Sequence, residues 1–273
     1  MESRESYDLS QSFVIGRAIS NGIEALKRQP LGMIIGAVLI AITGGGSPGG
    51  GGNLNANSNG LDEAQIAMLA TMVGCGLCCG LVMAVIRAWL EPGWYRLHRA
   101  IATTGEAELG VLFSGTDAFV PSLIYKVIHL GIGMGVFAIS SLPGAALMGV
   151  GYTQDQNMVM IGVGAALWGI IALPVCIYVE MGLLMGGRII GLDGMQPMEA
   201  LSQSWAMARG NRITLFLFVL VTGLFAALGL LACCIGVIPT SAIAQYGFTD
   251  AYLRATRDDM PEDLHGFTAG SPA

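Results

Sequence analysis

Long uninterrupted apolar blocks constrain this chain more than any other feature of its sequence. The clearest block, Ile213 to Ile235, contains no charged residue. Crossing a hydrocarbon layer of about 30 Å takes roughly 20 helical residues, and backbone polar groups in lipid must be paired within the segment, which favours helices. Charged residues make up only 12% of the chain, against about a quarter in soluble domains. We therefore expect an all-α, polytopic transmembrane helical bundle.

About six segments are expected to span the membrane. They lie near residues 31–46, 66–90, 119–148, 158–185, 213–235 and 236–254. Pro143 and Pro174 fall inside the third and fourth segments, and membrane helices tolerate proline where neighbours satisfy the freed carbonyl. The sequence from Glu91 to Gly93 contains Pro92 and is expected to break the second span, which leaves Trp94 to Ile101 at the level of the lipid headgroups.

The placement of lysine and arginine predicts the orientation. These residues precede the first segment, follow the second, separate the fourth from the fifth and follow the sixth, whereas the connections 44–65 and 149–157 contain none. Under the positive-inside rule both termini are cytoplasmic and the number of spans is even. The last segment contains Pro239, Gln245 and Asp250, so a re-entrant segment and a count of five are the alternative.

Three regions follow from this reading. Residues 1–30 are expected to form a cytoplasmic amphipathic helix, because apolar residues recur every three to four positions from Leu9 to Lys27. Similar basic amphipathic segments are expected to lie in the interface at the other cytoplasmic connections. Residues 31–256 form the transmembrane domain, with a glycine-rich external linker at 44–62, and residues 257–273 form a flexible acidic tail.

Several classes of function are excluded on sequence grounds. A net charge of −6 without a basic patch argues against nucleic acid as a partner. No nucleotide-binding, hydrolase or metalloprotease motif is present, so we expect neither enzymatic activity nor a cofactor. Cys75, Cys78 and Cys79 share a helix face at metal-ligand spacing, but the same span offers no histidine or carboxylate, and tight packing of small residues is the favoured interpretation.

Three ionisable residues inside the expected spans form the candidate site. Lys126 and His129 lie one helical turn apart in the third segment, and Glu180 lies near the returning end of the fourth. Charges within a membrane are expensive and often functional, so the three residues suggest a proton or ion relay. The favoured alternative is structural, with Lys126 paired to Glu180 to register two helices, or with its side chain extended to the interface.

One segment carries a resemblance to known families. Residues 197–216 read as a short helix, an Arg-Gly-Asn turn and an apolar span, and the positions that carry this pattern include Glu199, Ala200, Leu201, Ser204, Trp205, Arg209, Gly210 and Asn211. The pattern resembles poorly characterised bacterial membrane families: the YciC-like proteins, the DUF975 and DUF4013 groups, and the membrane domain attached to some glycerophosphodiester phosphodiesterases. The resemblance implies six helices in the bacterial inner membrane and no catalytic residues. In physical terms, Trp205 and Arg209 should anchor this motif at the interface.

Two functions remain in competition. The first is a non-enzymatic membrane organiser or scaffold, which contacts membrane lipids and either a membrane-protein partner or a second copy of the chain. The second is a small transporter or channel that uses Lys126, His129 and Glu180. The recurrence of basic amphipathic segments at the cytoplasmic connections favours the first.

Overall fold

The computed structural model describes residues 14–44, 63–153, 157–231 and 236–256, and every regular element in this part of the chain is helical. The elements are α1 (Ile15–Arg28), α2 (Pro30–Gly44), α3 (Glu63–Thr104), the 3₁₀ helix η1 (Leu109–Ala118), α4 (Phe119–Thr153), α5 (Met158–Leu183), α6 (Gly186–Asp193), α7 (Pro197–Ala208), α8 (Arg212–Leu231) and α9 (Val237–Thr256). The all-helical fold class is thereby confirmed.

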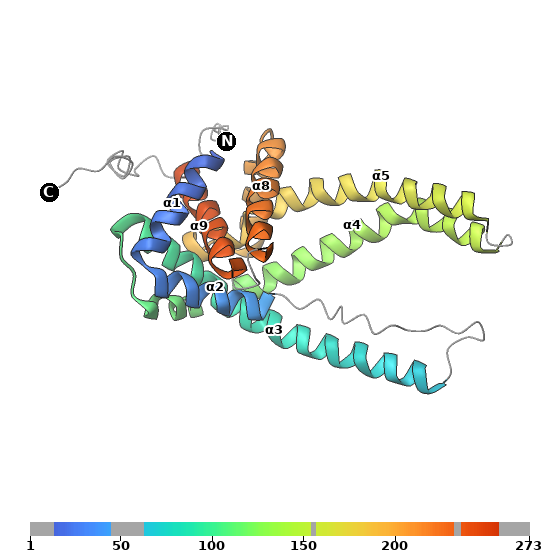
Figure 1. Cartoon of the computed structure of the whole chain (residues 1–273), viewed down its shortest axis with the longest axis horizontal. Coiled ribbons are helices and arrows are strands. Elements are labelled where there is room, and N and C mark those ends of the chain that lie inside the picture. The colour runs from blue at the N-terminus through green and yellow to red at the C-terminus, as the bar shows by residue number, and fades with distance from the viewer. Residues whose placement is uncertain (1–13, 45–62, 154–156, 232–235, 257–273) are drawn as a thin grey trace.

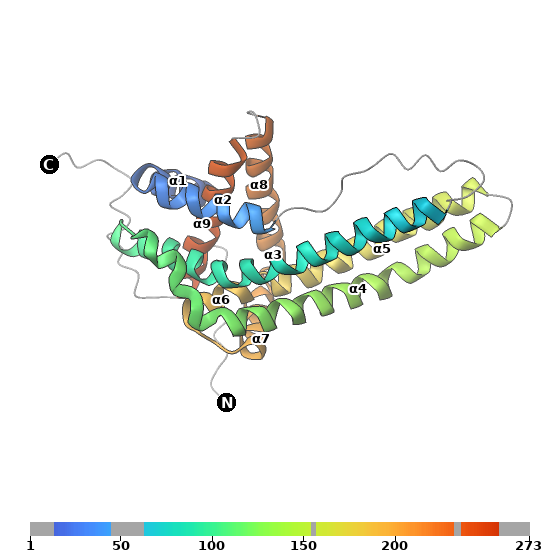
Figure 2. The same cartoon turned by 90° about the horizontal axis from the view of Figure 1, so that it is seen from below.

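The helices are arranged as a base with long projections (Figure 1). The base contains α1, α2, α6, α9, η1 and the C-terminal part of α3, while α4 and α5 form a hairpin that extends far beyond it (Figures 1 and 2). The N-terminal part of α3 projects in the same general direction, and α8 runs crosswise to the hairpin (Figure 1).

Large side chains of the base form the hydrophobic core together with side chains from α7 and α8. The largest fully buried ones are Trp94, Tyr252, Phe218, Met33, Leu97, Leu112, Met185, Ile189, Ile190, Met207 and Leu215. Gly36 lets α2 lie close to α3, because the ring of Trp94 in α3 occupies the space that a side chain at Gly36 would need. Burial of each such side chain contributes about 1.5–3 kcal/mol, so the base is where the fold is held together.

The expected break at Pro92 is wrong. Helix α3 continues through Pro92 to Thr104, and Trp94 and Tyr95 are buried in the core of the base. An internal proline removes one backbone hydrogen bond and costs roughly 3 kcal/mol. Burial of the residues that follow offsets this cost, and Gly93 allows the backbone to lie against Leu112 of η1.

The α4–α5 hairpin packs closely through two glycines. A Cβ atom on Gly144 of α4 would lie 2.7 Å from the carbonyl oxygen of Gly164 in α5, and one on Gly164 would lie 2.8 Å from that of Gly144. Small residues of this kind let membrane helices pack backbone to backbone. Pro143 and Pro174 both lie inside these helices, as the sequence predicts.

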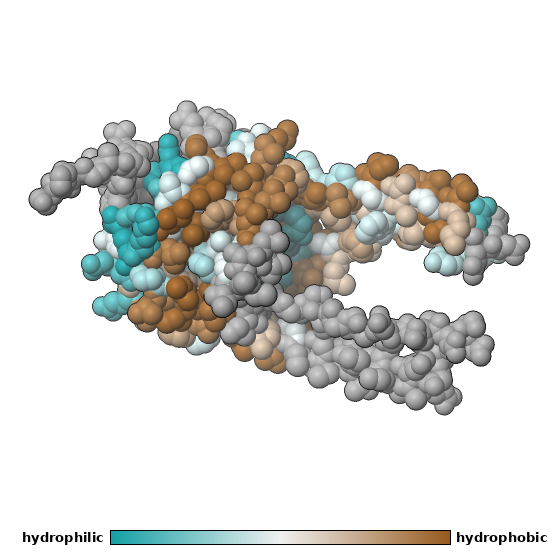
Figure 3. Space-filling view, in the orientation of Figure 1, coloured by the Kyte–Doolittle hydropathy of each residue, from teal (hydrophilic) through white to brown (hydrophobic). Residues whose placement is uncertain are grey.

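Three segments of the described chain are long and apolar enough to cross a membrane: Leu109–Thr153, Met158–Asp193 and Arg212–Gly229. Only 11%, 11% and 22% of the residues in their most apolar windows are buried. Figure 3 shows apolar surface over α8 and the outer part of the hairpin, and hydrophilic surface gathered at the far end of the base. Such exposed apolar surface on helices of this length is that of a membrane protein.

Within the described residues, all six expected segments overlap helices, but the first is short, with an apolar stretch at Pro30–Ile40. The count of six crossings therefore remains a prediction. The amphipathic helix α1 buries Ala18, Gly22 and Ala25, and Gly22 lies against Ile243 of α9. The residues before Val14, most of the linker at 44–62 and the tail at 257–273 lie outside the described residues.

Candidate functional site

A charged cluster joins α3 to α4 at the root of the hairpin. Lys126 Nζ of α4 donates a hydrogen bond to Glu91 Oε2 of α3, and Arg87 Nε lies 3.7 Å from the same oxygen. The hydroxyl of Tyr95 donates to Glu91 Oε1. The side chain of Glu91 is 15% exposed and that of Lys126 is 30% exposed, so the carboxylate is largely enclosed by its three partners.

The sequence reading missed Glu91 as a site residue. Arg87, Glu91 and Tyr95 are spaced four residues apart, which places their side chains on one face of a continuous helix. That spacing predicts a contact between Glu91 and Tyr95 on a continuous helix. The expected break at Pro92 argues against this contact, because a helix that ends there would not bring Tyr95 next to Glu91.

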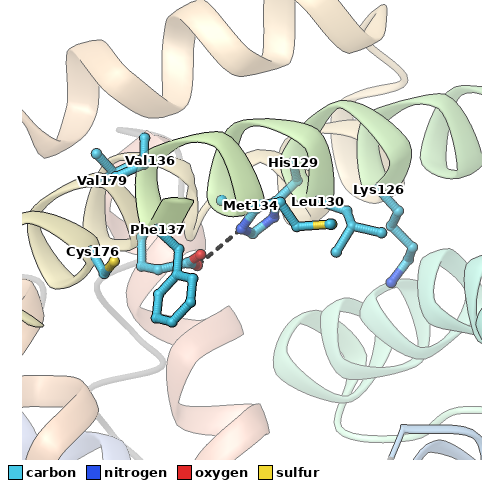
Figure 4. A pocket seen from close by; sticks show the side chains of 10 residues that line it. Lys126, His129, Leu130, Met134, Val136, Phe137, Cys176 and Val179 are labelled. Carbon is cyan, nitrogen blue, oxygen red and sulfur yellow. Dashed lines mark hydrogen bonds and ion pairs between the residues drawn. The ribbon is translucent and has the colours of Figure 1, made fainter. Parts of the chain in front are cut away.

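A second pair joins α4 to α5. His129 Nε2 lies 2.9 Å from Glu180 Oε2, as the dashed line in Figure 4 shows. The Glu180 side chain is 49% exposed, so one of its oxygens remains accessible. The structure thus brings His129 and Glu180 together as a pair, but Lys126 extends away from them toward α3 (Figure 4).

Tyr125 fixes the position of α4 next to these pairs. Its hydroxyl donates a hydrogen bond to the carbonyl oxygen of Leu183 at the end of α5, and its ring covers Gly186 at the start of α6. The ring of His129 lies 5.8 Å from that of Tyr125, edge to face. The α5–α6 junction therefore sets where His129 can point.

Two cavities adjoin the His129–Glu180 pair. One, of about 520 Å³, is lined by Lys126, His129, Leu130, Gly133, Met134, Val136, Phe137, Cys176, Val179 and Glu180. The other, of about 370 Å³, is lined by Phe137, Trp168, Ala172, Leu173, Cys176, Ile177, Glu180, Met181, Phe216, Val219 and Leu220. Phe137, Cys176 and Glu180 border both, and α8 closes the second. Volumes of this size are typical of small-molecule sites.

The motif that carries the family resemblance packs against the end of α5. Ser204 of α7 donates to the carbonyl oxygen of Gly182 at 2.8 Å and accepts from the backbone N–H of Met185 at 3.2 Å. Trp205 covers Gly182, and the guanidinium of Arg212 lies 4.4 Å from the Trp205 ring centroid. Ser204 and Trp205 therefore hold the root of the hairpin.

The remaining motif residues shape the two ends of α7. Glu199 lies in its first turn, where a carboxylate favours the helix N-terminus. Arg209 ends the helix, and Gly210 has a φ of +90°, which glycine adopts without strain. The carbonyl oxygen of Asn211 accepts from Leu215 and starts α8. The predicted helix and turn are thereby confirmed, and the apolar segment after them is a helix long enough to cross a membrane.

His98 is a buried titratable group in the base, beyond the expected second span. Its side chain is fully buried beside the Trp94 ring, and its Nδ1 lies 3.3 Å from Thr249 Oγ1. Burial and the nearby charge of Arg188 lower the pKa of His98 to about 3. This histidine is therefore neutral at physiological pH and belongs to the core.

Within the described residues, no group of three or more histidine, cysteine or acidic side chains lies close enough to hold a metal ion. Cys75, Cys78 and Cys79 lie in α3, but their side chains are outside the described part of the chain. The arrangement at the root of the hairpin offers paired charges beside an apolar cavity, which suits an amphiphilic ligand.

No family model, curated protein or solved structure matches this chain. The resemblance to the YciC-like and related families accordingly stays a prediction.

Proposed function

We propose that this protein is a non-enzymatic membrane organiser whose α4–α5 hairpin and α8 lie in the bilayer and whose basic connections face the cytoplasm. The observation that carries the proposal is that the charged residues of the hairpin lie at its root, while the rest of its surface is apolar. At its root, Lys126 and His129 are engaged with Glu91 and Glu180, whereas the rest of its surface is apolar and largely exposed.

The distribution of charge along the hairpin supports organisation over transport. Beyond the two pairs, neither 130–153 of α4 nor 158–179 of α5 contains a charged residue. A transported ion or proton needs polar groups along its route through the membrane. The Lys126–Glu91 ion pair and the His129–Glu180 contact, one helical turn apart on α4, instead suit the registration of three helices against one another.

The basic residues of α1 support a cytoplasmic placement of this helix next to the headgroups. Helix α1 packs its small residues against α9 and leaves Arg17, Lys27 and Arg28 on its exposed side. Exposed basic residues attract the anionic lipids of the inner leaflet by about 1 kcal/mol each. We therefore place both termini on the cytoplasmic side of the bacterial inner membrane, with lipids and a membrane protein or a second copy as partners.

The alternative function is a small transporter or channel. The observation in its favour is the cavity of about 520 Å³ that Lys126, His129 and Glu180 line together. Purified protein in liposomes that contain pH-sensitive and potassium-sensitive dyes separates the two functions. The organiser should give the same ion flux as empty liposomes, and a flux that Glu180→Gln abolishes would overturn it.

A positive test extracts the protein from its own membrane in polymer-bounded nanodiscs. If the protein is an organiser, its nanodiscs should contain a reproducible set of other proteins, or a lipid composition that differs from the bulk membrane. The comparison is with nanodiscs of a control membrane protein of similar size expressed at the same level. The matched variant Ile139→Ser, on the exposed side of α4, tests whether the hairpin surface recruits them. Extraction of a bare chain with bulk lipid composition would contradict the proposal.

A further inference from the structure

The lining of the two cavities beside the His129–Glu180 pair is charged at the root of the hairpin and becomes apolar toward α8. Lys126, His129 and Glu180 border the first. The second continues past Phe137 and Cys176 to the side chains of Trp168 and Phe216, and Glu180 is the only charged residue in its lining. A single molecule that fills both would need a polar end at the root of the hairpin and an apolar end against α8.

The charges at the polar end are separated by sign. Lys126 of α4 lines the first cavity and supplies a cation there, with its Nζ directed toward Glu91 of α3. Glu180 of α5 supplies a carboxylate to the same lining. The carboxylate of Glu180 has about four acceptor positions, and His129 occupies one of them.

We infer that these cavities bind a glycerophospholipid with a primary amine in its headgroup, such as phosphatidylethanolamine. Its phosphate lies toward Lys126, its ammonium donates to Glu180, and one acyl chain runs past Phe137 and Trp168 to Phe216. The inference rests on the membrane placement in the proposed function, but it does not depend on the organising role.

Charge complementarity selects this lipid over other amphiphiles. An anionic lipid or a fatty acid presents no cation to Glu180 and is repelled by it. Phosphatidylcholine carries the same charges as phosphatidylethanolamine, but its quaternary ammonium has no N–H to donate. A hydrogen bond to a charged group is worth about 1.5–3 kcal/mol, which corresponds to about tenfold or more in affinity.

Native mass spectrometry of the full-length protein tests the headgroup. The protein is mixed in detergent with equimolar phosphatidylethanolamine, phosphatidylcholine and phosphatidylglycerol that carry the same acyl chains. The wild type should retain phosphatidylethanolamine about tenfold over each of the others. Glu180→Gln should retain the three lipids about equally. Equal retention by the wild type, or a preference that Glu180→Gln leaves intact, would overturn the inference.

The path of the acyl chain is tested at the junction of the two cavities. Cys176→Phe should fill that junction and lower retention of all three lipids, whereas Ile139→Phe on the 71% exposed outer side of α4 should not. Should Cys176→Phe fail to fold, Leu173→Trp serves in its place. Phosphatidylethanolamine brominated on its acyl chain should quench Trp168 fluorescence, and an unchanged quench in Trp168→Phe would count against this path.

The two proposals fail separately. Ion flux in liposomes with an intact preference for phosphatidylethanolamine overturns the organiser and leaves the lipid site. If the wild type shows no preference for phosphatidylethanolamine and no ion flux, the lipid site is overturned and the proposed organising function still stands.

Discussion

Lys126 of α4 is paired with Glu91 of α3 and does not pair with Glu180 of α5. Glu180 is paired with His129 instead, so α4 contributes one residue to each of two contacts. Lys126 and Glu180, which the sequence suggests as one pair, therefore belong to two different contacts, one between α3 and α4 and one between α4 and α5. This division keeps part of the Glu180 carboxylate accessible at the edge of a cavity.

Neutralising Glu91 should destabilise the contact between α3 and α4. Glu91→Gln leaves Lys126 and Arg87 without their shared carboxylate, and we expect a loss of about 1–3 kcal/mol in the free energy of unfolding. Thermal unfolding in detergent measures this loss. Glu180→Gln, at a more exposed position, should cost less, and adding Lys126→Met to Glu91→Gln should restore part of the stability. A Glu91→Gln protein as stable as the wild type would contradict this role.

The close approach of α4 and α5 should depend on Gly144. A Cβ at this position would lie 2.6 Å from Trp168 Cβ, whereas one at Gly149 would meet nothing within 4 Å. Gly144→Ala should therefore lower the melting temperature and move the hairpin helices apart, as spin-label distances would show. Gly149→Ala should be neutral or slightly stabilising, because alanine favours the helix. Equal effects of the two substitutions would argue against this contact.

Acid should destabilise the base through His98. The pKa of His98 is lowered from 6.5 to about 3 in the folded protein, so the unfolded chain binds a proton at a higher pH than the folded one does. Its contribution to stability is complete above pH 6.5 and is lost as the pH falls toward 3, by roughly 1 kcal/mol per pH unit. Melting temperatures across this range should fall less steeply for His98→Gln than for the wild type.

The buried hydroxyl of Ser204 should hold the end of α5. Ser204→Ala removes its hydrogen bonds with Gly182 and Met185 and leaves a buried N–H without its partner, which should cost about 1–3 kcal/mol. Ser202→Ala is the matched control, because this serine is exposed and bonds only within α7. Unfolding in detergent should separate the two variants, and indistinguishable stabilities would count against the role of Ser204.

Reporter fusions should reveal the topology. Fusions after Thr104, after Asn211 and at the C-terminus should report the cytoplasm, because basic residues cluster at these connections. Fusions after Gly60 and Tyr152 should report the opposite side. A C-terminus outside the cytoplasm would make the segment at 236–254 re-entrant and reduce the crossings to five.

Hydropathy and local turn chemistry could be read without coordinates. The expected segments at 119–148, 158–185 and 213–235 coincide with α4, α5 and α8, because an apolar helix of membrane length needs no tertiary contact to be recognised. The helix and turn at Glu199, Ser204, Trp205, Gly210 and Asn211 also follow from local preferences. Their packing against Gly182 does not, because it joins segments that only the fold brings together.

The sequence by itself determined that this chain is helical and apolar, with only a few charges in its long apolar segments, since these properties depend on composition and periodicity. Tertiary structure alone decided the partners of those charges. Lys126 and Glu91 are 35 residues apart. The hydrogen bond from Tyr95 to the same carboxylate requires α3 to continue through Pro92, which burial of Trp94 and Tyr95 in the base makes favourable. Local propensity treats that proline as a break, and only the packing of distant segments outweighs it.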